Sequence, residues 1–316
     1  MKDLILKIIR KVVLSLKRNY KEPPLREWKK FSNKQYSNRL IYEKLVSNNP
    51  CMIGRIGSTE MLALTNYIGI KRNNIFQYFT GASFPFWWLN STKKQMENWS
   101  GFYPATDENL IKFSELMFND MEQVDILGSW LTNEKYFKKS LSNAKQVVLE
   151  DLEPFFTDNP WTKALEGKKV LVIHPFNELI EKQYKKRNEL FKNNLLPEFE
   201  LVTIKAIQSL GGNNSEFMDW FQALDFMKSE IDKVDFDICI VGAGAYGFPL
   251  AAHVKRIGKK SIHLGGVTQI LFGIIGKRWE IFRVWSYPNM FNDAWVRPGE
   301  LLKPKNADHV EDSCYW

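Results

Sequence analysis

The chain has 316 residues, a length that suits one large α/β domain or two smaller ones with a sizeable hydrophobic core. Its 44 lysines and arginines outnumber 36 aspartates and glutamates, so the net charge of +8 favours anionic partners such as nucleotides or phospholipid headgroups. Three widely spaced cysteines exclude a disulfide-stapled miniprotein and fit reduced thiols in a cytoplasm. No Cys/His cluster has zinc-ligand spacing, and no apolar run is long enough to span a bilayer.

The first segment predicts an amphipathic helix. Apolar residues recur at helical spacing at Leu4, Ile5, Ile8, Ile9, Val12, Val13 and Leu16, and the remaining surface carries Lys7, Arg10, Lys11, Lys17 and Arg18. This pattern is typical of a helix in an anionic membrane interface, although a helix packed on the body shows it too. Because Pro23 and Pro24 separate the helix from the following chain, we favour the membrane for residues 1–20. We therefore expect a cytoplasmic protein, peripheral at the inner face of the cell membrane.

The next segment predicts a helix from Asn33 to Ser47 and then a short apolar strand that reaches Arg55. A turn at Gly57 and Ser58 follows, and Ser58 can cap a helix that contains Glu60. An arginine and a glutamate at the end of a strand point toward the crevice in which open α/β sheets bind ligands. The alternative is a buried pair of Arg55 and Glu60 that only holds the turn.

Residues 76–102 are rich in aromatic and turn residues without a clean period. We expect an irregular, partly helical excursion that forms either a wall over the site or a membrane-facing surface. The pattern that follows predicts a helix, a strand and a second helix, at residues 109–121, 124–128 and 134–141.

From residue 146 onward, strands and helices alternate. Residues 146–156 predict a strand that runs into an acidic edge containing Glu150, Asp151 and Glu153. A buried strand that ends at His174, a basic helix at 178–193, a strand at 199–208 and a helix at 215–231 follow. Because each strand is nearly continuously apolar, the pattern indicates a Rossmann-like α/β fold, with a mostly parallel sheet and helices on both faces.

A strand–helix–strand unit occupies residues 236–273, and a glycine turn follows each of its strands. Gly242, Gly244 and Gly247 fit the pattern G-x-G-x-x-G, in which the N–H groups of a helix N-terminus bind a phosphate. A dinucleotide site also needs an acidic residue after the second strand, but His263 and two glycines stand there. The alternative is that the glycines only allow helix and strand to pack closely.

Parallel strands end at one edge of a sheet, so we expect these polar residues to form one site. The residues expected to bind a phosphorylated donor are Arg55, Gly57, Ser58, Gly244, Tyr246, Gly247, His263, Gly265, Gly266, Gln269 and Arg278. The candidate catalytic residues are Glu60 and Glu153 as general bases and His174, which is equally a structural histidine. Asp151, with Glu60 or Glu153, is a candidate ligand for Mg²⁺ or Mn²⁺. Because no nucleophile elbow or P-loop lysine is present, group transfer suits this set better than acyl hydrolysis.

Residues 277–316 combine aromatic residues and prolines without a period. We expect this tail to wrap the body and to close one side of the site. The predicted organisation is an amphipathic helix with its linker at 1–24, an α/β catalytic domain at 25–276 and the aromatic-rich tail.

Two segments carry a family resemblance. Residues 55–60, RIGSTE, follow the first strand and resemble the R-F-G-D-G-E element of the GT-D glycosyltransferases. The segment GAGAYGFPLA, with KKSIHLGG and LFG after it, is similar to the C-terminal pattern of that family. The likeness covers residues 51–273 in the order of elements, and the motif matches are confined to these two segments. The resemblance implies a Rossmann-like parallel sheet, a UDP-sugar donor and a D-x-E motif that binds a divalent metal, but Ser58 stands in place of the first acid, which leaves metal dependence open.

These features predict a glycosyltransferase at the cytoplasmic membrane face. It moves a sugar from a nucleotide-sugar donor to a lipid-linked or growing surface-polysaccharide acceptor, and we expect no nucleic acid partner. The alternatives are an oxidoreductase that binds a nicotinamide dinucleotide and a noncatalytic membrane-associated binding protein. The oxidoreductase lacks support because no acidic residue stands where one would bind the ribose. Substituting Glu60 and Glu153 separately would distinguish the noncatalytic protein, which should keep its cellular role without them.

Overall fold

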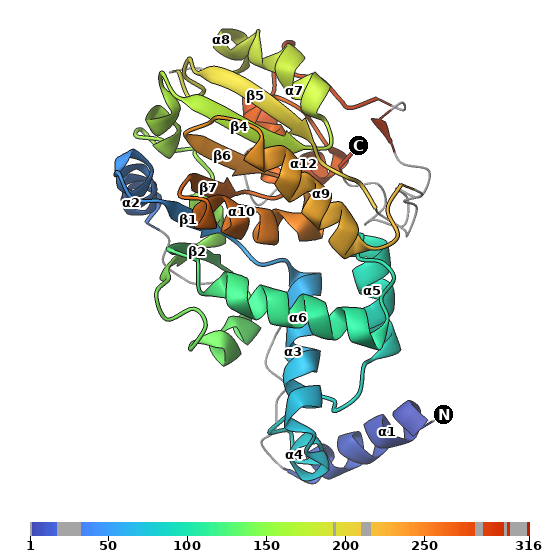
Figure 1. Cartoon of the computed structure of the whole chain (residues 1–316). Helices are drawn as coiled ribbons and strands as arrows, with labels where there is room; N and C mark the ends of the chain where they lie inside the picture. Colours follow the sequence, from blue (N-terminus) through green and yellow to red (C-terminus); the bar gives the residue numbers. More distant parts are fainter. Residues whose placement is uncertain are drawn as a thin grey trace.

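The computed structural model describes residues 2–17, 33–191, 194–209, 216–281, 287–299, 302–303 and 315–316. Seven parallel strands among these residues form one sheet in the order β3-β2-β1-β7-β6-β4-β5 (Figure 1). The strands are β1 (Cys51–Gly54), β2 (Ile126–Ser129), β3 (Lys145–Val148), β4 (Lys169–His174), β5 (Glu200–Lys205), β6 (Ile238–Val241) and β7 (Lys260–His263). The predicted Rossmann-like α/β fold is confirmed, and the sheet is parallel throughout.

Helices cover both faces of the sheet. One face carries α3 (Ser58–Arg72), α5 (Asn90–Ser100), α6 (Asp107–Met121), α9 (Trp220–Asp232) and α10 (Gly247–Arg256). The other face carries α2 (Lys34–Val46), the 3-10 helix η3 (Trp161–Leu165), α7 (Asn177–Tyr184), α8 (Arg187–Leu190), α11 (Val267–Leu271) and α12 (Lys277–Ile281). Successive residues of a strand enter opposite cores: Leu171 packs into the first and Val172 into the second. This double cover explains why the central strands β1 and β6 are apolar throughout.

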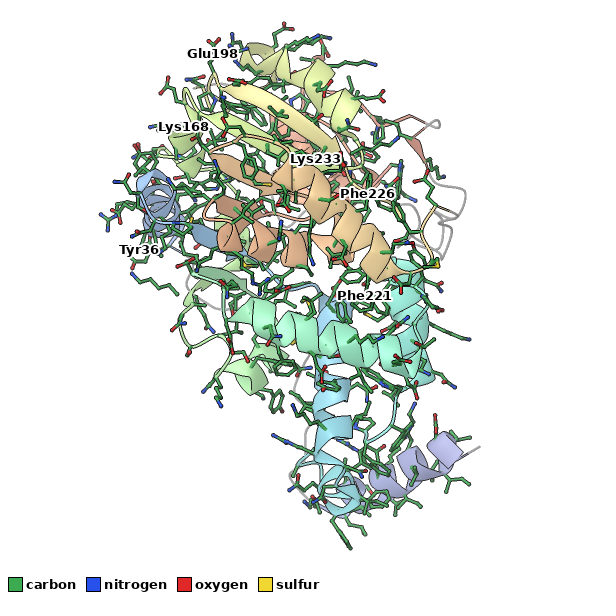
Figure 2. The ribbon with its side chains drawn as sticks, in the orientation of Figure 1. Tyr36, Lys168, Glu198, Phe221, Phe226 and Lys233 are labelled. Carbon is green, nitrogen blue, oxygen red and sulfur yellow. The ribbon has the colours of Figure 1, made fainter. Side chains whose placement is uncertain are left out.

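The amino-terminal edge of the sheet is a charged surface. Lys168, Glu198 and Lys233 precede β4, β5 and β6, and their exposed side chains are labelled in Figure 2. The pocket described below lies at the opposite, carboxyl edge.

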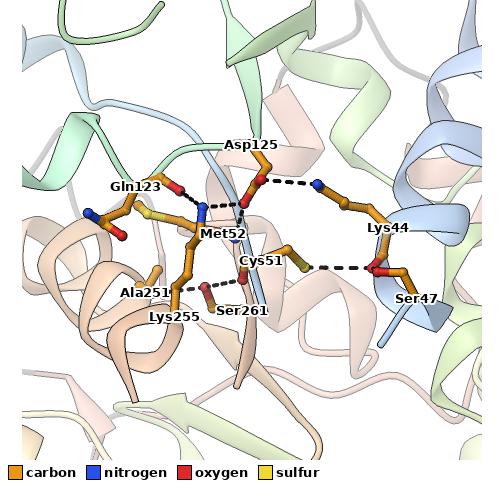
Figure 3. Close-up of polar contacts among 9 residues, drawn as sticks. All are labelled: Lys44, Ser47, Cys51, Met52, Gln123, Asp125, Ala251, Lys255 and Ser261. Atoms are coloured by element: carbon orange, nitrogen blue, oxygen red, sulfur yellow. Dashed lines mark hydrogen bonds and ion pairs between the residues drawn. The ribbon is translucent and has the colours of Figure 1, made fainter. Parts of the chain in front are cut away.

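Asp125 holds the amino-terminal ends of β1 and β2 together (Figure 3). Its carboxylate accepts the N–H of Met52 at 2.9 Å and pairs with Lys255 at 2.7 Å and Lys44 at 3.1 Å. Burial alone would raise the pKa of Asp125, but hydrogen bonds from Lys255, the Met52 N–H and Lys44 outweigh it and lower that pKa. Beside it, the Ser261 hydroxyl donates to the Ala251 carbonyl at 2.8 Å, which fixes α10 on β7.

Three predicted elements differ from those observed. The helix expected at 134–141 is a 3-10 helix, η1 (Thr132–Phe137), because the Glu134 carboxylate accepts the N–H groups of Trp130 and Leu131, both at 3.0 Å. The helix expected at 178–193 is broken into α7 and α8, with a turn between them that the Lys186 N–H closes on the Gln183 carbonyl at 2.9 Å. Residues 192–193 lie outside the described residues.

The acidic segment after β3 is also different from its prediction. The strand ends at Val148 and the chain turns into a 3-10 helix, η2 (Leu149–Leu152), so Asp151 and Glu153 face α2. Asp151 accepts from the Ser37 hydroxyl at 2.8 Å, and Glu153 accepts from the Tyr287 hydroxyl. Both acids are buried, and they attach α2 and the segment of Tyr287 to the end of the sheet. They do not line the pocket, so the structure does not bring them to the other candidate residues.

Because Glu153 is buried, we expect the free energy of unfolding to depend measurably on pH. Burial raises its pKa from 4.5 to about 7, and Lys34 and Tyr287 offset only part of this shift. Because the folded state binds this proton more tightly, its contribution to stability is complete below pH 4.5 and is lost as the pH rises through 7, by about 3 kcal/mol. Glu153→Gln cannot ionise, so we expect its urea midpoint relative to wild type to rise between pH 5 and pH 8. Glu166→Gln, at an exposed position, is the control; an equal shift in both variants would contradict the assignment.

The amino-terminal part and the excursion at 76–102 contain further helices. The predicted first helix is α1 (Lys2–Ser15), and the excursion contains the end of α4 (Ile75–Phe79) and α5, in agreement with its expected partly helical character. The linker with Pro23 and Pro24 lies outside the described residues, as do the start of the segment at 215–231, residues 304–313 and Cys314. Cys51 and Cys239 are buried and free. Within the described part of the chain, no helix combines the length and apolar character needed to cross a membrane.

Candidate functional site

A pocket of about 170 Å³ lies at the carboxyl edge of the four central strands, β1, β7, β6 and β4. Of the predicted site residues, it is lined by Arg55, Gly57, Ser58, Glu60, His174, Gly244, Tyr246, His263, Gly265, Gly266, Gln269 and Arg278. These residues come from separate strand ends, and the parallel arrangement of the strands is what brings them together. Gly247, Asp151 and Glu153 are absent from the described lining.

Arg55 follows β1 and is held by an aromatic ring. Its guanidinium carbon lies 5.0 Å from the centre of the Trp130 ring, and Trp130 Nε1 donates to the Ile56 carbonyl at 2.9 Å. On another side is Gly265, whose φ of +64° favours glycine and where a Cβ would lie 3.0 Å from Arg55 Nη1. The stacked ring and the close backbone position the cation in the pocket wall.

Glu60 lies in the first turn of α3, whose N-cap is Gly57. The carboxylate folds back over Gly57, so that a Cβ there would lie 1.8 Å from Glu60 Oε2. Glu60 is half-buried and lines the pocket. Arg55 lies over the Trp130 ring and Glu60 folds over Gly57, so the two side chains make different contacts at the turn.

We therefore expect the substitution Gly57→Ala to lower activity without unfolding the protein. Alanine tolerates the backbone at this position, φ −70° and ψ 153°, but its methyl group would displace the Glu60 carboxylate. If Glu60 performs the chemistry of the site, the displacement should lower the turnover rate by about 10²-fold at an unchanged melting temperature. The double variant with Glu60→Gln should be no slower than Glu60→Gln alone, because both changes remove the same group. Additive losses would contradict this reading.

His174 and His263 are both buried and neutral. Burial lowers the pKa of His174 to about 3, and burial with the nearby Arg55 lowers the pKa of His263 to about 3. His174 Nδ1 accepts the Phe176 N–H at 3.0 Å, which assigns its proton to Nε2. His263 Nδ1 is 3.2 Å from the Val241 carbonyl and must donate, because a carbonyl oxygen only accepts. His174 is thus a neutral hydrogen-bond donor at Nε2, and its low pKa makes it a weak base.

Two glycines of the turn after β6 serve different purposes. Gly244 has a φ of +52° and opens onto the pocket, where a Cβ would come no closer than 3.9 Å to another residue. At Gly247, a Cβ would lie 2.2 Å from His263 Cε1, so this glycine allows α10 to pack on β7. Gly247 is therefore needed for the close packing of helix and strand, and Gly244 is needed for the backbone conformation of the turn.

The electrostatic character of the pocket suits an anion. The first N–H groups of a helix have no partner inside it and carry a partial positive charge, and the first turn of α3 lines the pocket. Arg55 and Arg278 add two cations, and the Arg278 guanidinium lies 5.5 Å from the Tyr315 ring centre with a 3.0 Å hydrogen bond to its hydroxyl. Glu60 supplies a carboxylate to this lining.

The pocket lining also contains residues that the sequence pattern does not single out. These residues are Trp99, Trp130, Ser209, Tyr315 and Trp316. Tyr315 and Trp316 agree with the expectation that the tail closes one side of the site. Gln269 holds them there, because its Nε2 donates to the Tyr315 carbonyl at 3.3 Å.

Tyr246 lines the pocket but is committed to internal contacts. Its ring stacks on Trp220 at 4.9 Å and 8°, and its hydroxyl lies 2.8 Å from the Ser209 hydroxyl. Burial raises the pKa of Tyr246, so it remains a neutral phenol. Its contribution is to the shape of the glycine turn.

Of the predicted metal ligands, Asp151 and Glu153 lie near each other, and Glu60 lies apart from them in the pocket. Asp151 lies among Ser37 and Asn38, outside the pocket that Glu60 lines. Across the described ranges, no group of three or more His, Cys, Asp and Glu side chains has the arrangement of a metal site. In the described pocket lining, Glu60 is accompanied by the cationic side chains of Arg55 and Arg278.

Comparison with known proteins found no matching family model, no matching curated protein and no matching solved structure.

Proposed function

We propose that this chain is a glycosyltransferase that moves a sugar from a nucleotide-sugar donor to a lipid-linked or growing surface-polysaccharide acceptor at the cytoplasmic membrane face. The observation that carries the proposal is the joint lining of one pocket by Arg55, Arg278, the N-terminus of α3, the glycine turn before α10 and the Glu60 carboxylate. A diphosphate matches the positive groups, and an acceptor hydroxyl matches the carboxylate. The resemblance of residues 55–60 to the GT-D element supports the same assignment.

Each group has a role in the proposed reaction. The acceptor oxygen forms a bond to the anomeric carbon of the donor, the bond from that carbon to the diphosphate breaks, and the nucleoside diphosphate leaves. Glu60 takes the proton of the acceptor hydroxyl. Arg55, Arg278 and the N–H groups at the start of α3 stabilise the charge that develops on the leaving diphosphate.

His174 and the aromatic residues of the lining fit substrate positioning. The Nε2 proton of His174 suits a phosphate or sugar oxygen, because a neutral donor at that place needs an acceptor. Trp99, which is 45% exposed, and the C-terminal Tyr315 and Trp316 offer ring faces for a sugar or a base. Asp151 and Glu153 take no part in the proposed chemistry, because they bind α2 and Tyr287.

Divalent metal is not required by the proposed arrangement. Ser58 stands where the resembling family has its first acid, and the two arginines balance the charge of a diphosphate. Donor binding is therefore expected to persist when Mg²⁺ and Mn²⁺ are chelated.

The experiment is a thermal-shift screen of the full chain against UDP-sugars, other nucleotide sugars, nucleoside diphosphates and NAD(P), each with and without Mn²⁺. We expect stabilisation by a nucleotide sugar in both conditions, since a ligand that binds only the folded state raises the melting temperature. A shift with NAD(P) alone would replace the proposal by an oxidoreductase. No shift with any nucleotide would sink it.

A further inference from the structure

Helix α1 rests on the molecule through Leu14, which is buried, and through the half-buried side chains of Leu6, Arg10 and Val13. The Arg10 guanidinium lies 4.7 Å from the centre of the Tyr78 ring in α4, and its Nη1 donates to the Ser83 carbonyl at 3.1 Å. Just after the helix, Lys17 Nζ donates to the Thr80 carbonyl at 2.8 Å. These contacts fix the rotation of α1 about its own axis.

The opposite side of α1 is apolar and exposed. The exposed fractions are 63% for Leu4, 52% for Ile5, 53% for Ile8, 42% for Ile9, 55% for Val12 and 79% for Leu16. At 3.6 residues per turn, these positions cover an arc of about 140°. The charged residues of α1 fall outside this arc. Within the described part of the chain the arc faces solvent. Exposing this much apolar surface to water is unfavourable.

The neighbouring helix adds to this surface. Helix α4 contacts α1 and exposes 79% of Phe76 and 42% of Ile75. Exposed cations of the same region are Lys7, Lys11, Lys71 and Arg72. Figure 1 shows α1 and α4 together at the far end of α3, away from the sheet. Apolar side chains and cations are thus gathered at one protruding end of the molecule, which we name the α1/α4 tip.

We propose that the α1/α4 tip docks onto an anionic phospholipid bilayer, with its apolar side chains in the interface and its lysines on the lipid phosphates. An anionic bilayer binds protein surfaces that combine an apolar arc with cations along its border. A second copy of this chain is a poorer occupant, because pairing two tips would bring Lys7 and Lys11 of both copies together. Docking through the tip is independent of what the pocket binds.

The test is sedimentation of the full chain with vesicles of phosphatidylcholine, alone or mixed with phosphatidylglycerol. We expect binding to the anionic vesicles to be about tenfold or more stronger than to the neutral ones. The double variant Ile8→Gln/Val12→Gln should bind anionic vesicles about tenfold or more weakly, because it removes apolar surface from the centre of the arc. Lys7→Glu/Lys11→Glu should abolish the preference for the anionic vesicles.

Val46→Gln and Met218→Gln are matched controls, since these side chains are 46% and 84% exposed away from the tip. Both should keep wild-type vesicle binding, and circular dichroism should show all variants folded. Unchanged binding by Ile8→Gln/Val12→Gln, or no vesicle binding by the wild type, would overturn the assignment. A wild-type dimer that this double variant converts to a monomer, without vesicle binding, would assign the tip to self-association instead.

Discussion

Replacing Glu60 with glutamine is expected to lower the rate of the proposed sugar transfer by about 10²–10⁴-fold, the usual contribution of a positioned general base. Glutamine keeps the shape of the side chain over Gly57 but cannot take a proton. The melting temperature and donor affinity should therefore stay near those of the wild type. The measurement is release of nucleoside diphosphate under saturating donor and acceptor.

Glu122→Gln is the matched control for this prediction, because Glu122 is an exposed glutamate at the end of α6 and outside the pocket. It should retain the wild-type rate. If Glu60→Gln kept wild-type turnover, the base would have to be another group. A noncatalytic binding protein would show no turnover to lose and would keep its cellular role with either substitution.

Replacing Arg55 with methionine is expected to weaken donor binding by about ten- to a hundredfold, corresponding to about 1.5–3 kcal/mol for a hydrogen bond to a charged group. Methionine fills much of the same space against Trp130 but removes the cation. The donor affinity of Arg55→Lys should lie between those of the wild type and Arg55→Met. Lysine keeps the charge but loses the planar group and its paired hydrogen-bond donors. Calorimetric titration with a UDP-sugar measures all three proteins.

Arg39→Met is the control, because the Arg39 side chain is 66% exposed on α2, away from the pocket. It should bind the donor as the wild type does. Equal affinities for wild type and Arg55→Met would contradict a role of Arg55 in holding the diphosphate, and would direct attention to Arg278 and the N-terminus of α3.

The strand ends are where the sequence was most informative. Arg55 and His174 follow apolar runs and His263 is the last residue of β7, and parallel strands place such residues at one edge whatever their separation along the chain. That geometric rule needs no knowledge of loops. It also explains why Glu60, one turn into the helix after β1, reaches the same pocket.

The acidic segment after β3 shows the limit of that rule. Glu150, Asp151 and Glu153 follow an apolar strand too, but β3 is the edge strand of the sheet, far along the order from β7 and β6. Strand order is a tertiary property that the local pattern does not contain. Only the position of β3 in the sheet reveals that Asp151 accepts a hydrogen bond from α2 and that Glu153 accepts one from Tyr287.

The aromatic lining was equally inaccessible to local pattern. Trp130 contacts Arg55 across two neighbouring strands, and Tyr315 reaches the pocket through Gln269 and Arg278. Both contacts depend on how loops and the tail fold onto the sheet. The rotation of α1 is a further case: spacing predicted its apolar arc, but only the contacts of Arg10 and Lys17 show that the arc faces outward.

A crystal structure of the chain with a bound UDP-sugar tests the central proposal most directly. The account predicts the diphosphate beside Arg55 at the N-terminus of α3, with the anomeric carbon near Glu60. A nucleotide bound elsewhere, or one whose diphosphate lies away from Arg55 with Glu60 remote from the sugar, would contradict it.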